Sequence, residues 1–120
     1  MRKVIFSLLI IFTISILPVY AIDTVKIASM TYSVQSTTTT VENTATPLPA
    51  TALAGRESIA IINVNSVTKT VYIGGSDVTT TNGYPLTNTS PAISLDIDDS
   101  VVIYGIVTSG TADVRTLEAK

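Results

Sequence analysis

Three aspartates, Asp96, Asp98 and Asp99, are the residues whose type and spacing come closest to a chemical site. Asp96 and Asp98 alternate, so both would project from one face of a strand end, with Asp99 in the turn that follows. Carboxylate oxygens gathered in a loop could hold a calcium ion. However, the group lacks the glycine and the distal carboxylate of an EF-hand loop, and aspartates commonly initiate turns. We therefore interpret the three as turn residues and expect neither a metal site nor a cofactor.

Catalysis needs a titratable group poised near neutral pH, or a nucleophile beside a base. The chain has no histidine and no cysteine, so no imidazole can activate its serines and threonines. Lys69 stands between two threonines, and we interpret it as a solvated charge in an exposed turn. A carboxylate pair for glycoside hydrolysis would need a cleft, for which a core this small has no obvious room. The sequence predicts a non-enzymatic protein without catalytic residues.

The candidate contact residues are Gly75, Asp77, Asn82 and Tyr84, which would share one loop. Asn82 precedes Gly83, and Asn-Gly is a strong hairpin signal because both residues tolerate the left-handed region of a type I′ turn. Tyr84 beside this turn is expected to be exposed, and tyrosine is common at binding surfaces.

The first 21 residues have the pattern of a targeting signal. Arg2 and Lys3 form a positive head, residues 4–17 are apolar and uncharged, and Pro18 ends the run before small residues at 19–21. The apolar run is shorter than the roughly 20 residues that span a bilayer. We predict cleavage after Ala21, with no membrane span afterwards, and secretion or display at the cell surface. The alternative is an uncleaved N-terminal anchor.

Charge and cysteine content exclude two further classes. Cleavage after Ala21 would remove two cations and no carboxylate, so the exported chain would be more acidic than the −2 of the whole sequence. Its cations are not clustered, which argues against nucleic acid as a partner. Without cysteine there can be no disulfide framework, which points to a bacterial or phage-related protein stabilised by packing or by assembly.

The remaining pattern is that of a small all-β domain. Apolar, β-branched segments recur about every ten residues with turn residues between them, and no helical period follows the signal. Strands are expected at residues 59–64, 70–73, 78–81, 92–97, 101–107 and 114–118. The segment 59–64 is apolar enough to be buried on both faces, and Tyr72 and Tyr104 are expected to pack in the core. The spacing predicts one antiparallel β-sandwich or jelly-roll-like domain over residues 56–120.

Residues 22–55 are expected to form an extended, Thr-rich segment followed by a Pro-containing connector. Pro47 and Pro49 lack backbone donors, so residues 46–49 cannot be a central strand. An extended segment with unpaired backbone groups invites a partner strand. Two outcomes stay open: the segment folds back onto its own sheet, or it adds to the sheet of a neighbouring subunit, which is our hypothesis.

Residues 47–118 resemble a small β domain found in tailed-phage genomes as a virion structural or head-fibre-like protein. The most specific stretch is Val-Tyr-Ile-Gly-Gly-Ser-Asp-Val-Thr at 71–79. The other matching segments are residues 48–50, 54–61 with Asn63, 82–86, 103–106, 109–111 and 114–118. The resemblance implies a non-enzymatic virion component. Such proteins normally carry no export signal, so either the domain is reused on a cell surface or it belongs to an unusual virus or prophage.

Together these features predict a structural subunit of a virion-like or cell-surface assembly. Its partners would be copies of itself or other structural subunits. The alternative is a secreted binding module that recognises carbohydrate or a host surface through the loops at residues 75–84.

Overall fold

The computed structural model describes residues 32–120, so the predicted signal peptide and residues 22–31 lie outside the described residues. The strands are β1 (Val34–Val41), β2 (Thr46–Leu48), β3 (Ser58–Asn63), β4 (Val71–Gly74), β5 (Tyr84–Leu86), β6 (Ala92–Leu95), β7 (Ile103–Val107) and β8 (Ala112–Ala119). The predicted all-β class is confirmed. Across residues 32–120 there is no helix long and apolar enough to cross a membrane.

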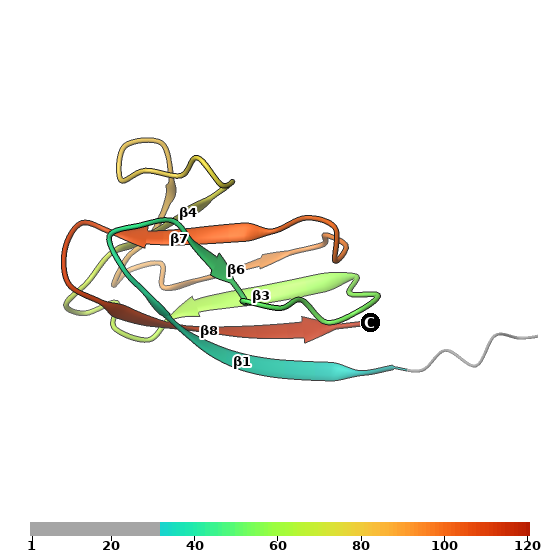
Figure 1. Cartoon of the computed structure of the whole chain (residues 1–120). Helices are drawn as coiled ribbons and strands as arrows, with labels where there is room; N and C mark the ends of the chain where they lie inside the picture. The colour runs from blue at the N-terminus through green and yellow to red at the C-terminus, as the bar shows by residue number, and fades with distance from the viewer. Residues whose placement is uncertain (1–31) are drawn as a thin grey trace, which may run out of the picture.

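The strands form two four-stranded antiparallel sheets, a first sheet of order β1-β8-β3-β6 and a second of order β2-β7-β4-β5. The pairing is nested: β1 pairs with β8, β2 with β7, β3 with β6, and β4 with β5. The described chain is therefore one long hairpin whose two arms are folded over together, which is the arrangement of a jelly roll. Figure 1 shows the two layers, with β1 and β8 in one and β4 and β7 in the other.

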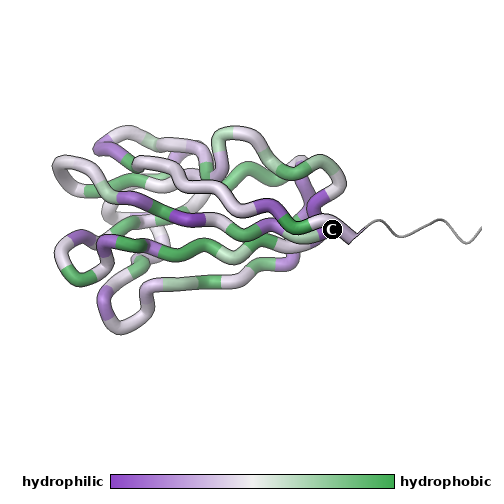
Figure 2. The backbone as a smooth tube through the Cα atoms, turned by 90° about the horizontal axis from the view of Figure 1, so that it is seen from below, coloured by the Kyte–Doolittle hydropathy of each residue, from purple (hydrophilic) through white to green (hydrophobic). Residues whose placement is uncertain are grey.

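The core lies between the sheets and is filled by alternate residues of the strands, so apolar and polar positions alternate along the chain (Figure 2). Its buried members are Val41, Leu48, Ile59, Ile61, Val71, Ile73, Leu86, Val107, Ala112 and Val114. The prediction that residues 59–64 are buried on both faces is wrong, because Ile62 is 43% exposed on the far side of β3. The outer face of the first sheet is not covered by any other described element.

The predicted type I′ turn at Asn82-Gly83 is also wrong. The two residues end a long loop, residues 75–83, between the paired strands β4 and β5. Among the described residues only Gly55 and Gly110 have positive φ, so Gly83 is not left-handed. Gly110 lies in the turn between β7 and β8. Residues 78–81, predicted as a strand, belong to this loop. Within the loop, the side chain of Val78 is buried.

Residues 34–48 belong to the same sandwich as residues 56–120. β1 pairs along its whole length with β8, from Val34 opposite Ala119 to Val41 opposite Ala112. Within the expected connector, β2 pairs with β7 although it contains Pro47. This is possible because β2 is an edge strand, where a missing donor on the outer side costs no ladder bond. Of the two outcomes left open, the described segment has the fold-back arrangement within one chain.

One buried hydroxyl allows a test of the core. Thr116 is buried on the inner face of β8, and its Oγ1 has no hydrogen-bond partner among the described residues. Thr116→Val keeps the shape and removes the unpaired group, so we expect unfolding to require about 1 kcal/mol more free energy. Urea denaturation measures the change. Thr40→Val is the control, because Thr40 is exposed and its Oγ1 donates to Asp113 (2.9 Å), so it should gain nothing. A destabilised Thr116→Val protein would contradict an unpaired hydroxyl.

Candidate functional site

Three of the four predicted contact residues lie on the β4–β5 loop, and the fourth, Tyr84, is the first residue of β5. Gly75, Asp77, Asn82 and Tyr84 are all exposed. Asn82 is committed to the loop itself: its Oδ1 accepts from the backbone N–H of Thr79 (2.6 Å) and its Nδ2 donates to the carbonyl of Asp77 (3.2 Å). Asn82 therefore shapes the loop, and the Asp77 carboxylate and the Tyr84 ring are left to meet a partner.

A small polar hollow of about 230 Å³ lies near one end of β4 and β7, away from this loop. It is lined by Thr68, Lys69, Thr70, Tyr72, Val107, Thr108 and Ser109. Lys69 Nζ donates to the carbonyl of Ser109 (2.9 Å), so the charge predicted to be solvated helps to tie two turns together. The hollow offers hydroxyl groups beside an aromatic ring.

Tyr72 and Tyr104 are not core residues, contrary to the prediction. Both are half-buried on the outer face of the second sheet, because their neighbours Ile73 and Gly105 point inward. A Cβ on Gly105 would come within 2.8 Å of Leu48 Cδ1, so this glycine permits Leu48 to pack closely against β7.

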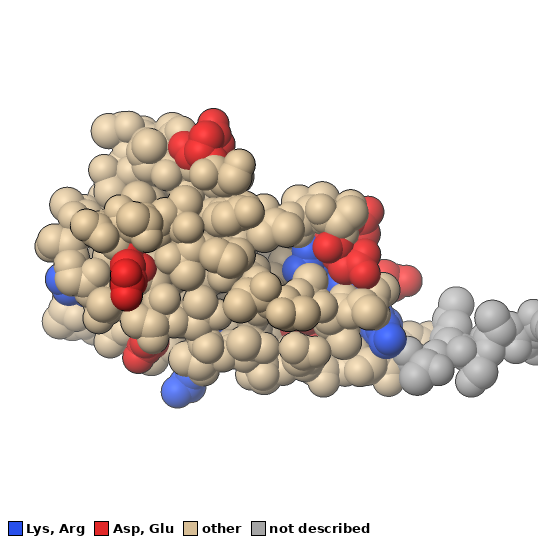
Figure 3. Space-filling view, in the orientation of Figure 1, with Lys and Arg blue, Asp and Glu red and all other residues tan. Residues whose placement is uncertain are grey.

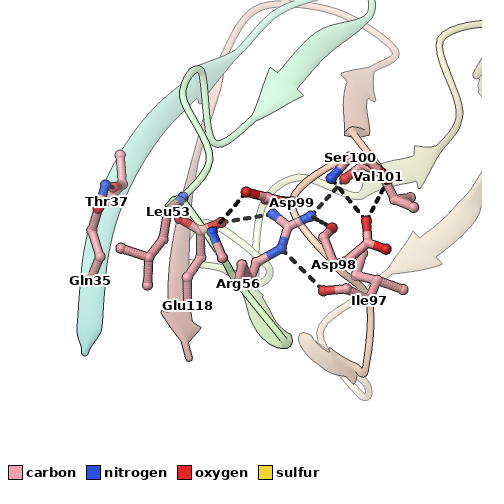
Figure 4. Close-up of polar contacts among 11 residues, drawn as sticks. Gln35, Thr37, Leu53, Arg56, Ile97, Asp98, Asp99, Ser100, Val101 and Glu118 are labelled. Atoms are coloured by element: carbon pink, nitrogen blue, oxygen red, sulfur yellow. Dashed lines mark hydrogen bonds and ion pairs between the residues drawn. The ribbon is translucent and has the colours of Figure 1, made fainter. Parts of the chain in front are cut away.

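The densest polar network surrounds Arg56, which is buried (Figure 4). Its Nη1 donates to Oε1 of Glu118 at 2.7 Å, and the two side chains are 1% and 0% exposed. Its Nη2 donates to the carbonyls of Asp98 and Val101, both at 2.6 Å, and Nε donates to that of Ile97 at 3.3 Å. The guanidinium thus anchors the β6–β7 loop to β8. Because the pair is enclosed, it is a structural element and not a site that a substrate could reach.

Of the three aspartates, Asp98 and Asp99 accept hydrogen bonds from nearby groups of the chain. Asp98 Oδ1 accepts from both the backbone N–H and the hydroxyl of Ser100, and these bonds hold the pKa of the exposed Asp98 below its ordinary value. Asp99 Oδ2 accepts from the backbone N–H of Gly55 (2.7 Å). The interpretation of these residues as turn residues fits the contacts of Asp98 and Asp99. No group of three potential metal ligands occurs within residues 32–120.

The outer face of the first sheet carries several exposed apolar side chains. Val34, Ile62 and Leu117 are 67%, 43% and 51% exposed on it. The strand register places Leu117 between Ser36 and Ala60, and it places Ile62 between Arg115 and Ala92. Small side chains beside large ones leave a hollow of about 370 Å³ there. In the view of Figure 3, charged side chains form isolated spots and one mixed cluster on a mostly uncharged surface.

Sequence reasoning missed both the Arg56–Glu118 pair and this outer face, although each left a signal. Glu118 falls on the same side of β8 as the core residue Val114, and a carboxylate there requires a buried partner. Leu117 alternates with Glu118 and so had to face outward. The alternation of side chains between the two faces of a strand therefore identifies exposed apolar residues as readily as buried polar ones.

The resemblance to phage structural proteins rests on the sequence motifs of residues 47–118 alone, and it stays a prediction. No family model, curated protein or solved structure matches this chain.

Proposed function

We propose that the protein is an exported, non-enzymatic structural subunit that assembles with copies of itself, on a cell surface or in a virion-like particle. The observation that carries the proposal is the uncovered outer face of the first sheet, where Val34 is exposed and Ile62 and Leu117 line a hollow. Export rests on the signal pattern of residues 1–21, which lie outside the described residues.

A second copy is the partner that this face fits best. Two sheets pack face to face about 10 Å apart, with side chains of one filling gaps of the other. The hollow between Ile62 and Leu117 has the size to receive such side chains. Covering the three exposed apolar residues would contribute about 25 cal/mol for each Å² removed from water. By analogy of fold alone, jelly rolls serve in viral capsids and in lectins.

The test is the mass of the exported protein in solution, measured by light scattering over a range of concentrations. We expect an oligomer, and we expect Ile62→Glu or Leu117→Glu to reduce its mass, because each places a charge in the contact. The matched control is Val67→Glu, since Val67 is an equally apolar, exposed residue in the turn between β3 and β4. Thermal unfolding should be similar for all variants, because the three side chains lie outside the core.

A protein that is monomeric at every concentration would contradict assembly. If that monomer bound immobilised glycans, the second candidate function, a secreted carbohydrate-binding module, would be favoured instead. The observation behind this second candidate is the polar hollow beside Tyr72, where threonine hydroxyls surround an aromatic ring.

A further inference from the structure

Four strands form the edges of the two sheets, and three of them are protected against pairing with another chain. β2 and β5 have three residues each and contain Pro47 and Pro85. β6 has four residues and lies between Pro91 and Asp96. Short strands, prolines and charges are the usual means by which proteins block sheet edges.

β1 is the exception, because it is long and has none of these features. Its eight residues, Val-Gln-Ser-Thr-Thr-Thr-Thr-Val, include no charge, no proline and no glycine. In Figure 1 no described strand lies beyond it. An exposed strand of this length and composition is a template for a further strand.

The hydrogen-bond pattern identifies the groups that this edge offers. Ser33 and Lys120 exchange both backbone bonds at 3.1 Å, and β1 and β8 remain in register from there onward. In an antiparallel ladder such pairs alternate, so the odd-numbered residues of β1 bond to β8 and the even-numbered residues point their backbone groups away. The outward-pointing residues are Val34, Ser36, Thr38 and Thr40.

We propose that two copies of the chain join through β1, antiparallel about a two-fold axis at Thr37, so that their first sheets become one continuous eight-stranded sheet. The inference rests on the proposed function and names a second contact surface for the same assembly. Centring the pair on Thr37 uses all four outward-pointing residues and no others: Val34 meets Thr40 of the second copy, and Ser36 meets Thr38. Moving the axis by one residue, to Thr38, would instead place Val34 opposite Glu42.

The side chains of β1 suit pairing with themselves. Opposed threonine and serine residues form favourable cross-strand pairs, and no like charges are brought face to face. On the outer face of the sheet, the charged neighbours of β1 on β8 are Asp113 and Arg115, opposite Thr40 and Thr38, one strand further in. In the joined sheet they are separated from the corresponding residues of the second copy by both β1 strands.

The experiment uses the exported Ile62→Glu protein, in which the outer-face contact is blocked and the β1 contact is left. We expect a dimer by light scattering. Thr38→Pro removes a donor that points away from β8 and places a ring in the path of the second strand, so it should raise the dimer dissociation constant roughly 100-fold or more. Thr38→Val is the matched control, because it keeps the donor and should leave the dimer intact. The melting temperature at low concentration should change little in either.

A single cysteine tests the register, because the chain has no other. In the proposed pair Thr37 faces its own copy at a non-hydrogen-bonded position, where Cα atoms lie about 4.5 Å apart, within disulfide reach. Thr37→Cys should therefore form a covalent dimer under mild oxidation. Gln35→Cys, two residues from the axis, should not.

The outcomes separate this inference from the proposed function. If the Ile62→Glu protein is already monomeric, or if its dimer survives Thr38→Pro, the proposed β1 contact is wrong. The proposed outer-face contact is not contradicted by either result. A dimer that is sensitive to Thr38→Pro but does not cross-link at position 37 overturns the two-fold pairing and indicates another strand on this edge. If the unmutated protein is monomeric, the proposed function fails as well.

Discussion

Replacing Glu118 by glutamine should lower the free energy of unfolding by about 3–5 kcal/mol, the range for breaking a buried ion pair on one side. The change keeps the shape of the side chain but leaves the Arg56 guanidinium enclosed without a counter-charge. In a domain of this size such a loss corresponds to a fall of more than about 10 °C in Tm. Urea denaturation followed by circular dichroism measures it.

The effect should be large because Glu118 holds two segments at once. Oε1 accepts from Arg56, and Oε2 accepts from the backbone N–H of Leu53 (3.1 Å), for which a glutamine offers a donor instead of an acceptor. The control is Glu57→Gln, which removes an exposed carboxylate beside Arg56 in the sequence and should change stability by less than about 0.5 kcal/mol. If both variants behave alike, the pair is screened by water and our account of the network is wrong.

Gly83→Val should lower stability by about 2–3 kcal/mol through overpacking. A Cβ at this position would lie 2.8 Å from Tyr72 Cβ, 2.8 Å from Val78 Cγ2 and 2.9 Å from the carbonyl oxygen of Thr79. The carbonyl belongs to the backbone and cannot swing aside, and Gly83 itself donates its N–H to that same oxygen (3.0 Å). The loop would have to open for the larger side chain to fit.

Gly75→Val in the same loop provides the comparison. Gly75 is exposed, and its added Cβ would approach only the end of the Asp77 side chain (3.2 Å), which can rotate away. We expect Gly75→Val to lower the urea midpoint of unfolding by well under half as much as Gly83→Val does. Equal losses at both positions would mean that backbone freedom, and not crowding, is what Gly83 provides.

Local pattern was sufficient to predict the class of this fold. In the strand predicted at 114–118, side-chain alternation puts Val114, Thr116 and Glu118 on one face, and the structure buries all three. Alternation cannot say which strands pair, however, and this is why β1 and β2 were assigned to a separate segment. Their partners β8 and β7 lie at the other end of the chain, and only the assembled sheets bring them together.

The candidate site was harder to predict, for the same reason. The loop that carries Asp77 and leads into Tyr84 is local in sequence, and its exposure followed from its turn residues. The Arg56–Glu118 contact joins residues 62 apart in sequence, and no spacing rule connects them. Asn63 is a further case: it is buried and donates to the carbonyls of Lys69 and Leu86, the latter in the opposite sheet. Such groups are identified only when their three-dimensional partners are known.

The nested pairing of the strands also predicts the order in which they join the sheets during folding. Among the described strands, only β4 and β5 are both consecutive in sequence and paired, so this hairpin can form while most of the chain is still unstructured. Each following pair closes a larger loop, and the last, β1 with β8, requires nearly the entire described chain. Topologies dominated by such distant contacts fold slowly, in milliseconds to seconds. A ribosome or a translocation channel that still holds the last residues would therefore keep β1 unpaired, and β1 would be the last strand to enter the fold.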